Sequence, residues 1–306
     1  MYVEALDVVK YYGSVEVLKK VSLRIEKPMV YSLLGPNGAG KSTFLNILAG
    51  VQKPSSGRVL IKGFDVSSAE AKHIIGYCPQ DVALYERLSG WDNIFFYASL
   101  YGVPRSEAKR RAGELLKLLN LESYASQRVA KYSGGMKKKL SLIVTLIHDP
   151  EVVILDEPTE GLDPESRLKV WGVVKRLRDE GKVVIIATHN MDEADRLSDR
   201  VGIIDRGKLL VEDSPENLKR MYGPPSVVEI VLRERPSENL IKRLREASKG
   251  AYSDERTLKI HVEEPDRAIP MLTELIYEAG SRIDSLKVVR PTLEDVFFRL
   301  TGRRLE

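Results

Sequence analysis

The alternation of apolar and polar side chains predicts strands at the start of the chain and a layered sheet after them. Residues 2–9 and 17–26 alternate in the manner of half-buried strands. Short unbroken apolar runs then occur at 30–34, 152–155, 183–187 and 201–204. Such β-branched runs, separated by longer segments, indicate an α/β fold with a parallel sheet whose two faces are both covered.

Amphipathic segments between these runs predict helices. The segments 165–179 and 191–197 repeat apolar side chains at helical spacing. Residues 91–119 have little strand character and contain two helical patterns, separated by Gly102, Val103 and Pro104. We interpret this stretch as part of a helical insertion, at about 84–150, between two parts of the sheet domain.

The pattern of apolar and polar residues changes after Gly-Pro-Pro at 223–225, which predicts a domain boundary. Beyond it the pattern predicts strands at 226–233, 251–254, 257–263 and 282–289, and helices at 237–248, 266–279 and 292–301. Helices interleaved with short strands suggest a small α+β domain, for which a ferredoxin-like arrangement is the candidate. The expected domains are therefore 1–222 and an accessory domain at 226–306.

Composition and charge place the chain among soluble globular proteins. Of 306 residues, 43% are hydrophobic and 30% are charged, and 48 Lys and Arg against 44 Asp and Glu give a net charge of only +4. This small, dispersed excess of positive charge does not indicate a surface that binds nucleic acid. The single cysteine, Cys78, excludes an intrachain disulfide and favours a reducing compartment. Without an apolar signal core or a run of about 18 apolar residues, we expect a cytosolic chain unless another subunit holds it at the membrane.

A glycine-rich run directly after the apolar strand at 30–34 has the spacing of a phosphate-binding loop. It consists of Gly35, Pro36, Asn37, Gly38, Ala39, Gly40, Lys41, Ser42 and Thr43. Glycines let backbone N–H groups curl around a polyphosphate, and the helix that follows adds the positive end of its dipole. In this pattern Lys41 reaches the β- and γ-phosphates and Ser42 ligates Mg²⁺.

Two carboxylates, Asp156 and Glu157, stand at the end of the apolar run 152–155. Ligands bind at this end of the strands in a doubly wound sheet. We expect Asp156 to hold Mg²⁺ through its water shell and Glu157 to take a proton from an attacking water. Taken alone, the pair could also start a turn or cap a helix.

A second glycine-bearing helix start occurs at Ser133, Gly134 and Gly135. A hydroxyl and unshielded amides at a helix N-terminus make another anion site. One mononucleotide does not need two phosphate-seeking helix starts, so the two sites make sense if they serve two different molecules. An ordinary loop is the alternative.

Together these motifs resemble the nucleotide-binding domains of ABC transporters, over residues 1 to about 220. In that resemblance 35–43 is the Walker A motif, 152–157 the Walker B motif and 132–136 the signature. The resemblance assigns Gln80 to the Q-loop, where it contacts Mg²⁺ and the attacking water, and Asp163 to the D-loop. His189 becomes the switch histidine on the γ-phosphate, and Tyr12 the aromatic that stacks on adenine.

The resemblance implies a P-loop NTPase fold of the ABC type, with a parallel core sheet, an N-terminal antiparallel β subdomain and a helical insertion. It implies an ATPase that uses ATP and Mg²⁺ and pairs with a second ATP-binding subunit, identical or different, and with a separate transmembrane permease at the cytoplasmic face of the membrane. The segment from Leu84 to Tyr101 is expected to border the cleft for a permease helix.

Details of the sequence point to a subtype. Residues 291–302 resemble the tail of export-type motors, which move drugs, polysaccharides and lipids, and Met136 in place of the commoner Gln occurs in the drug-export branch. Glu160 stands where small residues are usual, which puts the contacts of the D-loop in question.

Two other classes fit the phosphate loop less well. Soluble ABC ATPases of translation or DNA repair carry two such domains or long coiled-coil insertions, and the sequence contains neither. A GTPase or small-molecule kinase would leave the signature unexplained, and no guanine-reading [NT]-K-x-D motif is present.

Overall fold

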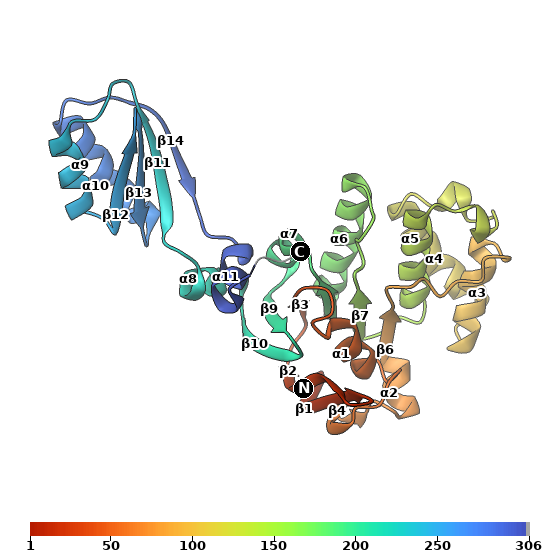
Figure 1. The fold of residues 1–306 in the computed structure, drawn as a ribbon. Coiled ribbons are helices and arrows are strands. Elements are labelled where there is room, and N and C mark those ends of the chain that lie inside the picture. The colour runs from red at the N-terminus through yellow and green to blue at the C-terminus, as the bar shows by residue number, and fades with distance from the viewer. Residues whose placement is uncertain (304–306) are drawn as a thin grey trace. The chain divides into compact units, whose positions relative to one another are not determined.

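The computed structural model describes residues 1–303, which form two compact units, Met1–Pro215 and a second unit that begins at Glu216 (Figure 1). Each unit has its own hydrophobic core. The last three residues of the expected accessory domain 226–306 lie outside the described part of the chain.

The first unit is built on a six-stranded sheet in the order β10-β9-β3-β8-β7-β6. Its strands are β3 (Met29–Leu34), β6 (Ile75–Cys78), β7 (Val152–Asp156), β8 (Val183–Thr188), β9 (Arg200–Asp205) and β10 (Lys208–Asp213). The paired strands run parallel except β10, which is antiparallel to β9. The expected parallel core of the sheet is therefore confirmed, and β10 adds one antiparallel strand at its edge. Arg206 and Gly207 both have positive φ, 47° and 77°, which suits the tight two-residue turn of a β-hairpin.

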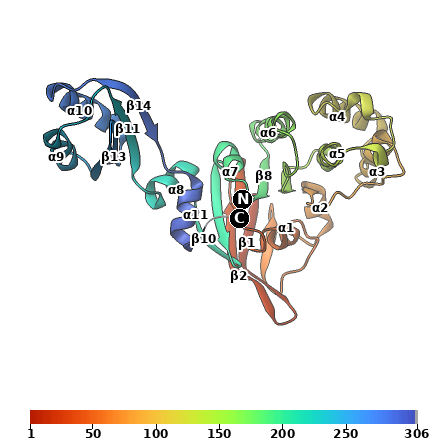
Figure 2. The ribbon, with the colours of Figure 1, turned by 45° about the horizontal axis from the view of Figure 1, so that its top comes forward.

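Strand periodicity divides the buried side chains of this sheet between two cores. Along β7, Val152 and Ile154 face one core, whereas Val153 and Leu155 face the other. The first core includes α1 (Lys41–Leu48) and α2 (Ala69–Ile74), and the second includes α3 to α7 (Figures 1 and 2). Both faces are thus covered, as the unbroken apolar runs predicted.

A second sheet of four strands completes the first core, in the order β2-β1-β4-β5. Its strands are β1 (Val3–Tyr12), β2 (Val15–Ile25), β4 (Ser56–Ile61) and β5 (Phe64–Asp65), all in antiparallel pairs. The antiparallel N-terminal subdomain implied by the resemblance is therefore confirmed. The sequence pattern had predicted only its first two strands.

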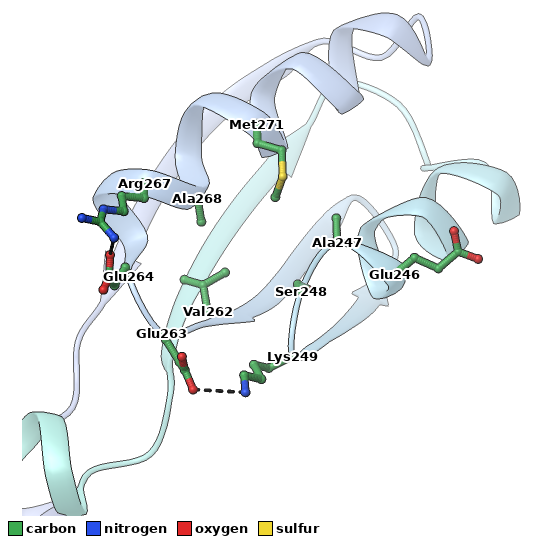
Figure 3. A pocket seen from close by; sticks show the side chains of 10 residues that line it. All are labelled: Glu246, Ala247, Ser248, Lys249, Val262, Glu263, Glu264, Arg267, Ala268 and Met271. Atoms are coloured by element: carbon green, nitrogen blue, oxygen red, sulfur yellow. Dashed lines mark ion pairs between the residues drawn. The ribbon is translucent and has the colours of Figure 1, made fainter.

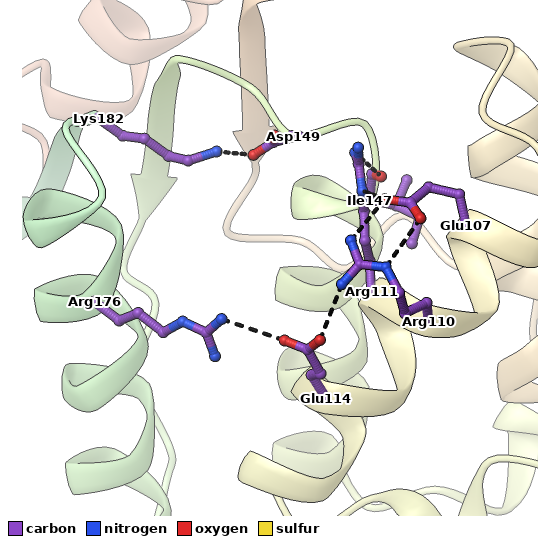
Figure 4. Close-up of polar contacts among 8 residues, drawn as sticks. All are labelled: Glu107, Arg110, Arg111, Glu114, Ile147, Asp149, Arg176 and Lys182. Carbon is purple, nitrogen blue, oxygen red and sulfur yellow. Dashed lines mark hydrogen bonds and ion pairs between the residues drawn. The ribbon is translucent and has the colours of Figure 1, made fainter.

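Helices fill the long connection between β6 and β7. They are α3 (Gly90–Leu100), α4 (Arg105–Leu118), two short 3-10 helices (Glu122–Tyr124 and Val129–Lys131) and α5 (Gly134–Leu146). Ser89 and Asp92 form a capping box that starts α3. Figure 4 shows Glu114 of α4 between Arg110 and Arg176, and Arg176 belongs to α6 (Pro164–Asp179) after β7. This ion-pair chain ties the helical insertion to the sheet domain.

The second unit is a small α+β fold. It contains most of α8 (Pro215–Tyr222), followed by β11 (Ser226–Leu232), α9 (Glu238–Glu246), β12 (Gly250–Asp254), β13 (Thr257–Val262), α10 (Pro265–Glu278), β14 (Ile283–Val289) and α11 (Leu293–Thr301). Its antiparallel sheet has the order β12-β13-β11-β14, the βαββαβ arrangement of ferredoxin-like domains. An open groove lies between the end of α9 and the start of α10, where Lys249 and Glu263 pair at 3.1 Å (Figure 3).

A half-buried histidine, His148, makes the stability of the first unit depend on pH. The rings of Tyr101 and His148 stack in parallel with centroids 3.7 Å apart, and Nε2 of His148 lies 3.0 Å from the carbonyl oxygen of Ile75. Burial lowers the pKa of His148 from 6.5 to about 4. His148 is therefore neutral in the fold at a pH where the unfolded chain already binds a proton.

We expect acidification from pH 6.5 to pH 4 to remove about 1–3 kcal/mol of stability through this residue, because only the unfolded state takes up the proton there. His148→Phe keeps the stacking and removes the titration. Its stability relative to the wild-type chain should rise by that amount between pH 7 and pH 4, measured by denaturant unfolding of the full chain. A difference that stays constant with pH would contradict this assignment.

Candidate functional site

Four neighbouring parallel strands carry the predicted site at their carboxyl ends. In the order β3-β8-β7-β6, they lead into the loop at 35–40, His189, Glu157 and Gln80. Carboxyl ends of parallel strands meet at one edge of a sheet, where ligands of doubly wound folds bind. Residues far apart in the sequence are thereby brought to one edge.

The loop at 35–40 is held by backbone contacts. Gly35 N donates to Thr188 O at 3.3 Å, and Ala39 N donates to Pro36 O at 3.2 Å. A Cβ on Gly35 would lie 2.3 Å from the carbonyl oxygen of Ile204, so the close approach of β9 requires glycine here. Asn37 and Gly38 form the exposed tip of the loop.

The start of α1 is left open for an anion. Gly40 is its N-cap, with φ 102°, a conformation that favours glycine, and no side chain caps the first turn. Ser42 and Thr43, both half-buried, lie in this turn after Lys41. The first N–H groups of a helix lack partners inside the helix and attract negative charge.

Lys41 is nearly buried at this helix start, with a relative exposure of 5%. Its Nζ donates to Gly35 O at 2.8 Å and to Pro36 O at 3.1 Å, and lies 3.5 Å from Oε1 of Glu157. Burial lowers the pKa of Lys41, and the charge of Glu157 opposes that shift. The ammonium group is thus held by weak carbonyl acceptors and one buried carboxylate.

Asp156 and Glu157 are buried at the end of β7, with relative exposures of 2% and 4%. Burial raises the pKa of Asp156, and the hydroxyl of Ser42 opposes this effect. Glu157 has φ 49°, which a non-glycine residue rarely adopts, and its N–H donates to Ala187 O at 2.9 Å. Such strain costs of order 1–3 kcal/mol and is concentrated at functional sites.

Three buried polar atoms around Lys41 have no hydrogen-bond partner. They are Oδ1 of Asp156, Oε1 of Glu157 and Nδ1 of His189. Nδ1 of His189 lies 3.0 Å from Oε1 of Glu157, at an angle that makes no hydrogen bond. Buried polar groups are normally satisfied, so these atoms fit a site completed by a polar, charged ligand.

The available ligands fit Mg²⁺ held jointly by protein and nucleotide. Among residues 1–303 no group of three or more His, Cys, Asp or Glu side chains is arranged to hold a metal ion. Asp156 with its neighbour Ser42 offers only a partial set of oxygen ligands. Mg²⁺ is commonly bound in this way, by one or two protein oxygens together with phosphates and waters.

Gln80 and Tyr12 make other contacts. Nε2 of Gln80, an exposed side chain, donates to Oε2 of Glu160 at 3.1 Å. Tyr12 ends β1 with a ring exposure of 46%, and its hydroxyl donates to Gln52 Oε1 at 2.7 Å. The ring of Tyr12 is thus exposed to solvent. The side chain of Gln80 is held by Glu160, which stands in the turn after Glu157.

The signature and D-loop residues lie at two helix starts. Ser133 caps α5 by accepting from Met136 N at 3.2 Å, and Asp163 caps α6 by accepting from Ser166 N at 2.9 Å. Ser133, Gly134 and Asp163 are exposed. A Cβ on Gly134 would meet no atom of residues 1–303 within 4 Å, whereas one on Gly135 would lie 3.1 Å from Leu162.

Sequence reasoning missed the residues that hold the catalytic loop in place. Glu193, 1% exposed, lies on α7 (Met191–Leu197), the helix after His189. Its Oε1 accepts from Thr159 Oγ1 at 2.7 Å and from Trp171 Nε1 at 3.1 Å. Glu193 therefore joins the loop of Glu157 to the helix that follows His189. The only sequence signal was a carboxylate on the apolar side of a short helix.

We expect Glu193→Ala to lower stability by about 2–4 kcal/mol, because two buried donors lose their acceptor. The melting temperature should fall by about 2–4 °C per kcal/mol in a domain of this size. Glu193→Gln keeps the acceptor and should stay within about 1 kcal/mol of the wild-type chain. Calorimetry of both variants tests this, and equal melting temperatures for Glu193→Ala and the wild type would contradict it.

Comparisons with known proteins agree with this geometry. The family model described as "ABC transporter" matches residues 18–160. The chain is 34% identical to the linearmycin resistance ATP-binding protein LnrL of Bacillus subtilis, over 99% of both chains. It is 35% identical to the Nod factor export ATP-binding protein I of Rhizobium etli, over 98% of this chain and 93% of that protein.

A solved structure is similar to a large part of the chain. It is the dimeric, post-hydrolysis state of an ATP-binding cassette bound to ADP and Pi, with a TM-score of 0.65 and 27% identity. The match covers 69% of this chain and 98% of that one.

Proposed function

This chain belongs to the ABC transporter family as an ATP-binding subunit with ATPase activity, and from that premise we propose that it powers export as half of an ATP-driven dimer. The observation that carries the proposal is the buried set of unpaired polar atoms beside Lys41, under an uncapped helix start. The names of two relatives, which describe resistance to linearmycin and export of Nod factor, support export rather than import.

In this proposal, bound ATP and its Mg²⁺ complete the contacts of the polar groups that lack hydrogen-bond partners. The polyphosphate of ATP accepts from the backbone N–H groups of 38–43 and draws Lys41 away from Gly35 O and Pro36 O. Hydrogen bonds to charged phosphate are stronger than the carbonyl contacts that they replace. Asp156, Ser42 and Gln80 would hold Mg²⁺, which neutralises charge on the phosphates when bound. Tyr12 offers its exposed ring to the adenine.

Glu157 is the general base in this proposal. Its carboxylate takes a proton as the oxygen of water attacks the γ-phosphorus and the bond to the bridging oxygen of ADP breaks, which gives ADP and inorganic phosphate. Nδ1 of His189 lies 3.0 Å from Oε1 of this carboxylate. In this proposal His189 also contacts the γ-phosphate. A placed general base contributes about 10²–10⁴-fold in rate. The strained backbone of Glu157 fixes the carboxylate in advance.

Gly134 supports a site shared between two subunits. Glycine in a helix is less favourable than alanine by about 1 kcal/mol, and within the described part of the chain no atom lies within 4 Å of a Cβ at Gly134. A second molecule that approaches the start of α5 closely would require the absence of a side chain. We propose that Ser133, Gly134 and Gly135 close over ATP bound to the second subunit, identical or different, with Asp163 at the same contact.

Coupling to transport requires a separate transmembrane permease. In the part of the chain that the structure covers, every helix is too short or too polar to cross a bilayer. We place the chain at the cytoplasmic face of the membrane, held by the permease. Within the segment from Leu84 to Tyr101, Tyr85 and Leu100 are 50% and 61% exposed, so this segment offers apolar surface for a permease helix. We assign ATP binding to 1–222, with the helical insertion at about 84–150, and an accessory role to 226–306.

Replacement of the general base tests the chemistry. Glu157→Gln should bind ATP and Mg²⁺ but hydrolyse at least about 100-fold more slowly. It should elute as a dimer with ATP and as a monomer with ADP, measured by size exclusion with light scattering. Wild-type turnover in this variant would remove Glu157 from its role.

Complementation tests the shared site. Gly134→Asp adds a negative charge at the start of α5, where a Cβ meets no atom of the described residues within 4 Å. Lys41→Ala weakens the phosphate loop. Each variant alone should be nearly inactive, whereas their mixture should recover part of the activity, because one mixed site has both parts intact. Gly172→Asp is the matched control, since Gly172 is also an exposed helical glycine whose Cβ would meet nothing within 4 Å. A mixture as inactive as its components would contradict a site shared between two copies of this chain.

A further inference from the structure

Glu160 connects three parts of the site. Its Oε2 accepts from Nε2 of Gln80 at 3.1 Å and lies 3.7 Å from Nζ of Lys138. Its backbone oxygen also accepts from Nζ of Lys138, at 3.2 Å. Gln80 follows β6, Lys138 lies on α5, and Glu160 stands in the turn after Glu157. One side chain thus joins the strand end of Gln80, the signature helix and the turn that leads to Asp163.

The contact with Glu160 decides which way the amide of Gln80 points. An ionised carboxylate only accepts hydrogen bonds, so the NH₂ end of Gln80 must face it. The carbonyl oxygen Oε1 of Gln80 is then turned from the carboxylate, free to accept a hydrogen bond or to ligate a cation. A small residue at position 160 would leave both orientations of the amide available.

Glu160 is itself held in place. The side chain of Lys138 is only 11% exposed, whereas that of Glu160 is 44% exposed, so the less exposed lysine anchors a more exposed carboxylate. Within the turn, Glu160 N donates to Glu157 O at 3.3 Å. The carboxylate that orients Gln80 is therefore tied by the backbone to the residue that acts as general base.

We propose that Glu160 is a positioning residue that orients the amide of Gln80, with Lys138 as its anchor. The proposal rests on the proposed function, because the role of Gln80 toward Mg²⁺ and the attacking water belongs there. Glu160 touches neither nucleotide nor water itself, and acts through Gln80.

The proposal predicts opposite effects on turnover and on ATP binding. Glu160→Ala frees the amide of Gln80, so kcat should fall roughly tenfold, the range for loss of one charged hydrogen bond. It also removes a negative charge that acts on Lys41, so KM for ATP should stay unchanged or fall. Glu160→Gln keeps an acceptor but can also donate a hydrogen bond, so it should recover only part of kcat. Merely structural damage would instead raise KM in both variants.

The experiment compares Glu160→Ala, Glu160→Gln, Gln80→Ala and the double variant Gln80→Ala/Glu160→Ala in the full chain, by steady-state ATP hydrolysis. Glu165→Ala is the matched control, because Glu165 is an exposed glutamate close in the chain, paired with Lys169. A second readout avoids turnover: ATP affinity is measured with Mg²⁺ and with a chelator in the Glu157→Gln background. Glu160→Ala should reduce the gain in affinity that Mg²⁺ gives.

The outcomes separate this inference from the function on which it depends. Suppose that Glu160→Ala lowers kcat as a single change, but that the double variant has the same kcat as Gln80→Ala. The two residues then act as one unit and the proposal stands. If Gln80→Ala is impaired while Glu160→Ala matches the control, the proposal is overturned and the role of Gln80 remains. If Gln80→Ala has wild-type kinetics, the proposed role of Gln80 fails first, and the proposal fails with it.

Discussion

A buried lysine faces a buried glutamate at the carboxyl edge of the central sheet, and the site is organised around this pair. Lys41 and Glu157 are 3.5 Å apart, with side-chain exposures of 6% and 5%. Ions removed from water need strong partners, yet Lys41 otherwise meets only carbonyl oxygens, and the Glu157 oxygen that faces Lys41 accepts no hydrogen bond. The fold thus holds opposite charges in a partly satisfied state that a polyphosphate can complete.

The surrounding fold keeps this arrangement from relaxing. β8 lies between β3 and β7, so the phosphate loop and the acidic strand end stand on either side of His189. Glu193 fixes the turn after Glu157 by its contact with Thr159, and Glu160 extends the same turn to Gln80. Enzyme sites of this kind give up stability for preorganisation. Two hydrophobic cores on opposite faces of one sheet supply the stability that offsets this loss.

Regular apolar patterns made much of the fold predictable from the sequence. The helices at 164–179 and 191–197, the break at 102–104 and the order of elements after 226 follow the predicted spacing, and the family resemblance inferred from the motifs is confirmed by full-length relatives. β6 escaped prediction because it has only four residues, and β4 because its first half, Ser56, Gly57 and Arg58, is not apolar. The antiparallel β10 escaped because its hairpin turn, Arg206-Gly207, has no strong sequence signal.

The candidate site, like the fold, could be predicted from the sequence only in part. Motifs with fixed spacing, such as 35–43, identify the groups that meet ATP, because the chemistry sets the spacing. Contacts between distant segments are set by packing alone, so the link from Gln80 to Glu160 and that from Thr159 to Glu193 could not be derived from the sequence. Gly134, which we propose faces a second subunit, was recognisable from the sequence motif. The structure adds that no atom of the described residues lies within 4 Å of a Cβ at this position.

The most direct test is the position of Lys41 Nζ in a crystal structure of Glu157→Gln with ATP and Mg²⁺. The account predicts that Nζ leaves Gly35 O, now 2.8 Å away, and contacts β- and γ-phosphate oxygens. A lysine still bound to Gly35 O and Pro36 O, with nucleotide held elsewhere, would contradict it.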